Sequence, residues 1–560
     1  MRQRGPQSRG AWSCAPTTIS AELNFAETYE SPDVTTQRRF RYALLTIALP
    51  LTALVLLPVG YLFVRAAEIE PQRAFSILTR PGTLRVIGRS LLLVLSVSAT
   101  ACLVGVPAAW LTVRSDLKAR RLWTVLLTLP LVIPSYIGAF ALVGALGPRG
   151  MVQRWLQPLG VELWPSIYGF WGAWLALSLF AYPYVFLSTR AGLRGLDPAL
   201  EEASYTLGRS HLETFWRITL RQALPSISAG ALLVALYTLS DFGAVAIMQY
   251  NVFTRVIYLR LSLDLDLAAL LSVVLVLLTA LLLALAMLVE RGHGRTASRR
   301  AHYRPRPVRL GRWQALALTF CALVVTLALL LPVGVIAYWL VNGLQQGETV
   351  RSVLAPLQRS LRVSALAAVA CGLAALPLVW LQVRAASPFT HLLARSAYLG
   401  YALPGVVVGL AFVFLGARIL GELNALFGLS SYRSLGLLVL AYGVRFLPQA
   451  LGPARASLLQ VNPHLEEVAQ TLGRGYLSAL ITVTLPLMRS GLVAGLALVF
   501  LTAMKELPIT LLLAPTGYDT LATRIWSASN EAFYARAAAP ALTLVLISAL
   551  SLVYILEPDD

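Results

Sequence analysis

Long apolar runs separated by short polar segments fill most of the 560-residue chain. Four of these runs, at 43–64, 91–111, 266–289 and 537–555, approach or exceed the roughly 20 apolar residues that a helix needs to cross a bilayer. The pattern predicts an all-α polytopic membrane protein with about 12 membrane helices. The expected spans are 43–65, 88–112, 122–146, 166–188, 228–249, 266–290, 313–341, 360–383, 392–417, 433–450, 491–514 and 535–556.

The composition agrees with a chain that is largely surrounded by lipid. Hydrophobic residues make up 57% of the sequence and charged residues 13%, whereas a soluble protein carries about 25% charged residues. The net charge is +20, and nearly all of the positive charge is arginine, much of it in the segments that join the apolar runs. Arginines in such segments orient membrane helices, so we expect the positive charge to serve membrane insertion and not the binding of a nucleic acid.

The basic segments also predict the orientation in the membrane. The segment 291–312 holds eight arginines and no acidic residue, and the loop 113–121 adds Arg114, Lys118, Arg120 and Arg121. An even number of predicted helices separates the two segments, so both fall on the same side, which the positive-inside rule makes the cytoplasm. The polar residues 1–42 precede the first span, and we expect them to form a disordered cytoplasmic tail.

The two halves of the chain repeat each other. The segment 107–114 matches 377–384 at an offset of 270 residues, and the segment 197–208 matches 462–473 at an offset of 265. Six predicted helices lie in each half, so the repeats are parallel and relate by a pseudo-two-fold axis along the membrane normal, with a shared path between them. The expected organisation is a tail (1–42), a first repeat (43–290, core 85–290), a basic linker (291–312) and a second repeat (313–556, core 355–556).

The repeated segment 197–208 is a polar stretch between apolar runs, and its sequence predicts a short helix with defined ends. A helix of about ten residues is too short to be stable alone, so we expect it to lie against a partner surface. In the first copy, Ser210 and Glu213 form a capping box that starts a second helix, which makes each loop a helical hairpin. The N-caps are Asp197 and Asn462, the first-turn prolines are Pro198 and Pro463, and the left-handed exits are Gly208 and Gly473.

Both copies resemble the EAA signature of ABC importer permeases. Glu202-Ala-Ser precedes Gly208 by the spacing of that signature, and Glu467-Val-Ala precedes Gly473 by the same spacing. The signature continues into an Ile-x-Leu-Pro element, where the first copy has Arg221 in place of the proline. The resemblance assigns ATPase coupling to Glu202, Ala203, Gly208, Glu467, Ala469, Gly473 and Pro486.

The resemblance implies a set of partners. In this family the hairpin docks on a cytoplasmic ABC ATPase, expected here to be a dimer, and a periplasmic substrate-binding protein delivers the cargo. Lys118 follows leucine and Lys505 follows methionine, so neither belongs to a Walker A loop. We therefore expect ATP and Mg²⁺ to bind the partner ATPase, with no cofactor in this chain. The chain is expected to be a multi-pass transport subunit of the bacterial inner membrane, not an enzyme.

The fused, double-length layout is similar to that of the ferric-iron and thiamine permeases. The stretches 506–513 and 518–524 look most like the iron(III) branch. We therefore expect ferric iron to be carried from the periplasm to the cytoplasm, with thiamine and other small anions or phosphonates as alternatives.

Two carboxylates interrupt apolar runs at equivalent positions. Asp241 and Glu506 match at the 265-residue offset, and Lys505 lies beside Glu506. Charges inside a membrane usually face the bundle interior or an aqueous cavity. One interpretation places both carboxylates on the substrate path, and the other pairs Lys505 with Asp241 to fix helix packing. The membrane segments hold no cluster of hard oxygen ligands, so we expect no tight metal site.

Two other classes of function remain as alternatives. An ion-coupled secondary transporter typically needs several buried carboxylates, and only Asp241 and Glu506 qualify. A polytopic membrane enzyme would need convergent polar or acidic residues at the membrane face, and the sequence shows none. The five histidines are isolated and the four cysteines form no Cys-x-x-Cys pair, so neither residue type predicts a catalytic or metal centre.

Overall fold

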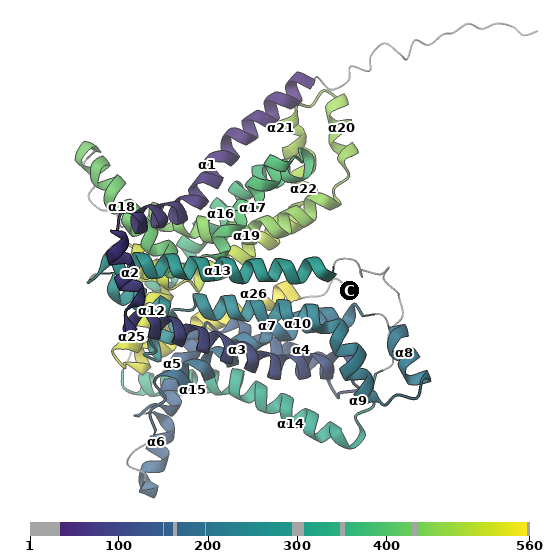
Figure 1. The fold of residues 1–560 in the computed structure, drawn as a ribbon, viewed down its shortest axis with the longest axis vertical. Helices are drawn as coiled ribbons and strands as arrows, with labels where there is room; N and C mark the ends of the chain where they lie inside the picture. Colours follow the sequence, from purple (N-terminus) through teal and green to yellow (C-terminus); the bar gives the residue numbers. More distant parts are fainter. Residues whose placement is uncertain are drawn as a thin grey trace, which may run out of the picture.

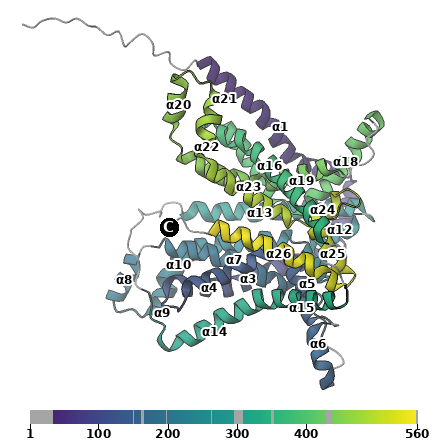
Figure 2. The same ribbon diagram turned by 180° about the vertical axis from the view of Figure 1, so that it is seen from behind.

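The computed structural model describes residues 34–148, 150–160, 165–196, 198–261, 263–293, 307–347, 353–427 and 434–556. These residues form helices joined by short connections, and the β-structure among them is one bridge between Ser115 and Val308. Most of the long helices run side by side between two ends of the molecule (Figures 1 and 2). The all-α polytopic fold class is confirmed.

The first half contains six long or bent helical segments that match the predicted spans. They are α1 (Val34–Ala67), α3 (Pro81–Arg114), α4 (Arg120–Thr128) with η1 (Leu129–Val132) and α5 (Ser135–Leu146), α7 (Phe170–Arg194), α10 (Leu220–Ser240) and α13 (Leu265–His293). Shorter helices in this half are α2 (Pro71–Thr79), α6 (Met151–Leu156), η2 (Gln157–Leu159), α11 (Gly243–Ile247) and α12 (Phe253–Arg260).

The second half repeats this order. Its spans are α14 (Gln314–Val325) with η5 (Thr326–Leu330) and α15 (Leu331–Gln345), α16 (Leu354–Arg384), α17 (Pro388–Ala402) with α18 (Gly405–Phe427), α19 (Leu435–Gln460), α23 (Arg489–Met504) and α26 (Tyr534–Leu556). The remaining short helices are η4 (Gly311–Trp313), α24 (Pro508–Leu513) and α25 (Leu521–Asn530).

The number of membrane helices is close to the prediction. Among the described residues, eight helices are long and apolar enough to cross a membrane, and the number rises to 11 when each of three bent pairs counts as one span. The twelfth predicted span, 535–556, falls on α26, within which Tyr534–Leu550 is a further apolar helix beyond those 11. Helix α1 begins at Val34, inside the segment expected to be a tail, and residues 1–33 lie outside the described residues.

The third span of each half is bent by more than 40° at matching prolines. Ile133 precedes Pro134 with φ −79° and ψ 115°, and Leu403 precedes Pro404 with φ −78° and ψ 128°. A residue before proline is driven out of the helical region by a clash with the proline ring, so each bend is encoded in the sequence. Beyond the first bend, α5 is buried along nearly its whole length.

The first helix of each half packs against the other half. Helix α1 contacts α16, α17 and α18, while α14 and α15 contact α4 and α5. On α1, the Phe40 ring lies edge-on to Trp380 with centroids 5.0 Å apart and stacks on Tyr476 at 5.7 Å. The two repeats are therefore interlocked by exchanged helices.

Close backbone packing between α3 and α7 generates a first prediction. A side chain at Gly105 would place its Cβ 2.9 Å from the Phe186 nitrogen, whereas nothing lies within 4 Å of the same point at Gly88 on the same helix. Gly105→Val should therefore destabilise the folded protein by about 2 kcal/mol through overpacking. The measurement is the thermal unfolding temperature in detergent, with Gly88→Val as the matched control. Equal unfolding temperatures for the two variants would contradict this account of the α3–α7 contact.

Candidate functional site

The two predicted hairpins lie at the same end of the molecule. The first consists of α8 (Pro198–Thr206), α9 (His211–Thr214) and the π-helical turn η3 (Phe215–Thr219), and the second of α20 (Pro463–Thr471), α21 (Tyr476–Ala479), the π-helical turn η7 (Leu480–Thr484) and α22 (Leu485–Leu487). Figures 1 and 2 show α8, α9 and α20 at one end, while α6 and α18 project at the opposite end. Residues equivalent in sequence are thus also equivalent in position.

The ends of the short helices follow their predicted caps. Gly208 and Gly473 have φ values of +78° and +82°, in the left-handed region that favours glycine. The Asn462 side chain accepts the His464 N–H at 3.1 Å. In the first hairpin, Ser210 Oγ accepts the Glu213 N–H at 3.3 Å, which is the expected half of a capping box, whereas the predicted cap Asp197 lies outside the described residues.

Each hairpin is tied to a membrane helix by a mostly buried ion pair. In the first half, Arg114 at the end of α3 has a 4% exposed side chain and lies 3.3 Å from Glu201. Thr219, the last residue of the π-helical turn η3, donates its hydroxyl to Glu201 at 2.7 Å. A π-turn shifts the register of the chain by one residue, and here it ends on the residue that meets Glu201.

The second half builds the same contact with more hydrogen bonds. Arg384 at the end of α16 donates Nε and Nη2 to the Glu466 carboxylate at 3.1 and 3.0 Å, and Nη2 also donates to the Val461 carbonyl at 2.9 Å. Thr484, the last residue of η7, donates to the same carboxylate at 3.0 Å. Charge-assisted bonds in a mostly buried site are stronger than exposed ones, so this hairpin is firmly held.

Sequence reasoning missed this anchor. It selected the second glutamate of each pair, Glu202 and Glu467, whereas the first, Glu201 and Glu466, makes the buried contact. The signal in the sequence was an arginine at the end of each repeated segment, Arg114 in 107–114 and Arg384 in 377–384, at the 270-residue offset. A repeated arginine at a membrane boundary needs a carboxylate partner wherever it becomes buried.

The expected coupling residues lie mainly on the outer side of the short helices. Glu202, Ala203, Gly208, Glu467, Gly473 and Pro486 are exposed, whereas Ala469 is buried. Leu207 and Leu472, which directly follow α8 and α20, are 77% and 76% exposed, so apolar side chains at the ends of both helices also point outward. Glu467 meets His464 Nδ1 at 2.8 Å on the surface. An outer surface with exposed leucine and glutamate side chains fits a protein partner.

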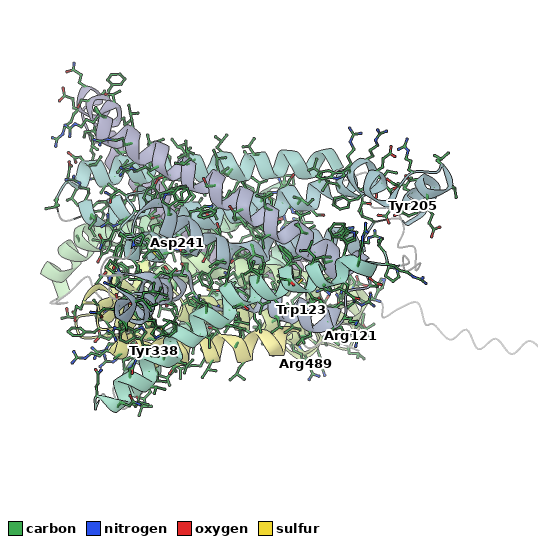
Figure 3. The ribbon with its side chains drawn as sticks, turned by 90° about the horizontal axis from the view of Figure 1, so that it is seen from below. Arg121, Trp123, Tyr205, Asp241, Tyr338 and Arg489 are labelled. Carbon is green, nitrogen blue, oxygen red and sulfur yellow. The ribbon has the colours of Figure 1, made fainter. Side chains whose placement is uncertain are left out.

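The inner side of the first hairpin is packed. Ser204 is buried and shares a hydrogen bond of 2.8 Å with Thr214. Burial, followed by the charge of Glu201, raises the pKa of Tyr205, while Arg114 acts in the opposite direction. Figure 3 places Tyr205 at the hairpin end of the molecule, away from Asp241 inside the helix bundle.

The copy with Arg221 and the copy with Pro486 leave their hairpins at different angles. The first hairpin continues without a break from η3 into α10, and Phe215–Ser240 forms one continuous span. In the second hairpin, where Pro486 is present, Tyr476–Leu487 meets Arg489–Met504 at an angle of 75°. A proline alone does not set this angle, because the continuous span of the first copy also holds Pro225 inside α10.

Asp241 and Glu506 end two of the predicted spans early because each caps a new helix. Asp241 accepts the N–H groups of Ala244 and Val245 at 3.0 and 3.3 Å and a hydrogen bond from Ser135. These contacts place the carboxylate at the start of α11, where the helix dipole favours negative charge.

Glu506 occupies the equivalent place at the start of α24, with a cation beside it. It accepts the Ile509 N–H at 3.3 Å, and Arg445 Nη1 lies 3.4 Å away. The predicted pair between Lys505 and Asp241 is wrong, since no ion pair joins these two described residues and Asp241 is bonded to helix N–H groups instead. A Cβ at Gly405 would fall 1.8 Å from Arg445 Nη1, so glycine makes room for the guanidinium where the first half has Ser135.

Two parallel six-span repeats, each with a hairpin anchored at the same end, define a polytopic membrane transport protein. The family model described as "Binding-protein-dependent transport system inner membrane component" matches residues 101–298 and 364–558. The chain belongs to this family, as a fused, double-length permease of the ABC type in the inner membrane, and is a transport component, not an enzyme.

Several curated proteins are similar to the chain. The Fe(3+)-transport system permease protein FbpB 2 of Haemophilus influenzae is 33% identical over 517 residues, which cover 90% of this chain and 95% of that protein. The sulfate transport system permease protein CysT of Synechococcus elongatus is 27% identical over 201 residues, covering 36% and 71%. The molybdenum transport system permease protein ModB of Escherichia coli is 32% identical over 169 residues, covering 29% and 72%.

The anchor predicts different roles for two adjacent glutamates. Glu466→Gln leaves the mostly buried Arg384 without its counter-charge, and breaking such a pair should cost about 3 kcal/mol. Glu467→Gln, one residue along, changes an exposed side chain and should cost less than about 0.5 kcal/mol. The measurements are the thermal unfolding temperature and the rate of limited proteolysis within the hairpin. Equal protection of the two variants from the protease would contradict the assignment of Glu466 as the anchor.

Proposed function

We propose that this chain is the permease subunit of an ABC importer that carries ferric iron from the periplasm to the cytoplasm. A separate ATPase dimer binds the two hairpins, and a periplasmic binding protein delivers the iron. The observation that carries this proposal is the pair of matched hairpins at one end of the molecule, each held by a buried arginine–glutamate pair. The hairpin end is cytoplasmic in this proposal, and so is the N-terminus.

The surface of the hairpins supports ATPase docking. Each short helix exposes a glutamate, Glu202 or Glu467, and is followed by an exposed leucine, Leu207 or Leu472. Helices of nine residues are not stable alone and here depend on their anchors, so they can transmit a load only where they are held. Two such surfaces per chain would allow each subunit of an ATPase dimer to bind one hairpin.

The anchors also give a route for force. A displacement of α8 acts on the end of α3 through Glu201 and Arg114, and a displacement of α20 acts on α16 through Glu466 and Arg384. Both hairpins also continue along the chain into α10 and α23. Closure of the ATPase dimer would therefore shift two helices of each repeat together.

Ferric iron is the cargo favoured by the similarity over nearly the whole chain to an Fe(3+)-transport permease. Asp241 and Glu506 would border the path as acidic groups, while the ion itself is passed on and not retained. Carboxylates whose charge is already shared with helix N–H groups would attract a trivalent cation without holding it tightly.

An oxyanion is the second candidate cargo. Sulfate and molybdenum permeases match part of the chain, and two cationic side chains, Arg445 and Lys505, lie close to Glu506 in space or sequence. Arginine and lysine are suited to binding tetrahedral anions. Uptake of labelled iron, molybdate, sulfate and thiamine by a deletion strain that expresses this chain distinguishes the candidates. Uptake of an oxyanion in the absence of iron uptake would exclude the first.

Docking on the hairpins is tested by recovery of an ATPase with the intact chain. The double variant Glu202→Ala and Glu467→Ala changes only exposed side chains, so the permease should stay folded while recovery falls about tenfold, equivalent to 1.4 kcal/mol. The control is Glu70→Ala, an exposed acidic residue that precedes α2 at the opposite end. Undiminished recovery with the double variant would exclude the two glutamates as docking residues.

The path role of the carboxylates is tested by Asp241→Asn and Glu506→Gln. Amide oxygens still accept hydrogen bonds from helix N–H groups, so capping is largely kept while the charge is removed. Iron uptake should fall about tenfold in each variant at normal membrane abundance, because each 1.4 kcal/mol of lost stabilisation is a factor of ten. Unchanged uptake would leave only the capping role.

A further inference from the structure

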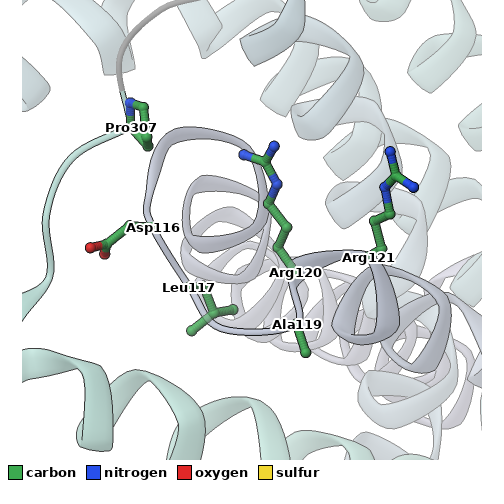
Figure 4. Close-up of a pocket in the computed structure, with 6 residues that line it drawn as sticks. All are labelled: Asp116, Leu117, Ala119, Arg120, Arg121 and Pro307. Atoms are coloured by element: carbon green, nitrogen blue, oxygen red, sulfur yellow. The ribbon is translucent and has the colours of Figure 1, made fainter.

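A cavity of about 530 Å³ opens beside the first hairpin anchor. It lies where α3 ends and α4 begins, and the chain arriving from the basic linker closes one side. Figure 4 shows the arginine side chains of α4 on one side and Pro307 with Asp116 on the other. The lining residues are Asp116, Leu117, Ala119, Arg120, Arg121 and Pro307.

Backbone hydrogen bonds fix the linker against this loop. The Val308 N–H donates to the Arg114 carbonyl at 2.8 Å, and the Asp116 N–H donates to the Val308 carbonyl at 3.1 Å. The Leu310 N–H donates to Asp116 Oδ1 at 2.8 Å, so the acidic group of the cavity is already engaged. The cavity is therefore a built feature of the folded chain.

The two arginines outnumber the one acidic residue of the cavity, Asp116. Arg120 and Arg121 are exposed, and neither forms an ion pair with a residue of the described ranges. The formal charges of the lining residues add to +1, from two arginines and one aspartate. A guanidinium presents two parallel N–H donors to a phosphate, so this lining suits a phosphate with a single negative charge.

Apolar side chains next to the cavity place it at the edge of the hydrocarbon region. Leu122, which directly follows Arg121, and Val125, one turn further along α4, are exposed. Helix α14 packs against α4. Trp313, just before α14, and Leu316, in its first turn, are exposed. Tryptophan is enriched at membrane interfaces, and basic pockets between membrane helices bind lipid headgroups.

We propose that this cavity binds the phosphodiester headgroup of one anionic phospholipid. Arg120 and Arg121 bind the phosphate, while the acyl chains lie along Leu122, Val125 and the exposed face of α14. The lipid would bridge α4 of the first half and the linker that leads to α14, and so brace the loop that carries Arg114. The inference is independent of the cargo and of the ATPase.

The second repeat serves as an internal comparison. At the 270-residue offset, Asp116, Arg120 and Arg121 correspond to Ala386, Thr390 and His391. Thr390 is buried in the capping box of α17, and no linker of the described chain crosses this loop. The proposal therefore predicts one such lipid per chain and not two.

The test is native mass spectrometry of the full chain, released from nanodiscs that contain phosphatidylglycerol or phosphatidylcholine. The intact chain should retain one phosphatidylglycerol at least fivefold more strongly than phosphatidylcholine, and Arg120→Gln with Arg121→Gln should abolish that preference. The control is Arg489→Gln, an exposed arginine at the start of α23, which should leave the preference unchanged. Asp116→Ala, which releases the linker, should weaken the retention as well.

Several results would overturn the proposal. The first is equal retention of both lipids by the intact chain. The second is an unchanged lipid preference in the double arginine variant at an unchanged unfolding temperature. The third is displacement of the lipid by millimolar inorganic phosphate, which would identify a site for the free ion. Loss of ATPase recovery in the double variant with lipid retention intact would instead assign the arginines to a protein contact.

Discussion

The buried pairing of an arginine with a glutamate is the interaction on which the two hairpins depend. A guanidinium at a membrane boundary cannot lose water without a counter-charge, and the glutamate that supplies it lies on a helix too short to hold its own shape. One contact thus fixes both partners, the end of a long span and the position of a short helix. The threonine that ends each π-helical turn adds a second bond to the same carboxylate, which links the start of the returning span to the anchor.

The pattern of apolar runs predicted the helical class, the approximate spans and the repeat, because membrane thickness and side-chain polarity act locally. The hairpin caps were also predictable, since Gly208 and Gly473 are needed at left-handed positions. The anchor was not, because adjacent glutamates differ only by about 100° around a helix, and which one turns inward depends on the distant Arg114 or Arg384. The packing of α1 and α14 against the opposite half could not be predicted from the sequence either, because an apolar run that faces lipid does not specify which helix lies next to it.

The two intramembrane carboxylates have the same structural role in the two halves. Each accepts N–H groups at the start of a short helix, which spreads its charge without cancelling it. The surroundings then differ between the halves. Asp241 has a hydroxyl beside it, whereas Glu506 has Arg445, for which Gly405 leaves space. The electrostatic environment of the two carboxylates is therefore asymmetric, although the two repeats have the same order of helices.

Fusion of the two halves adds a further asymmetry at the anchors themselves. The linker forms its hydrogen bond with the carbonyl of Arg114, the residue whose guanidinium holds the first hairpin. The equivalent Arg384 instead reaches the Val461 carbonyl through its own side chain and makes the closer contact with its glutamate. The first anchor is thus braced from the backbone and the second from the side chain.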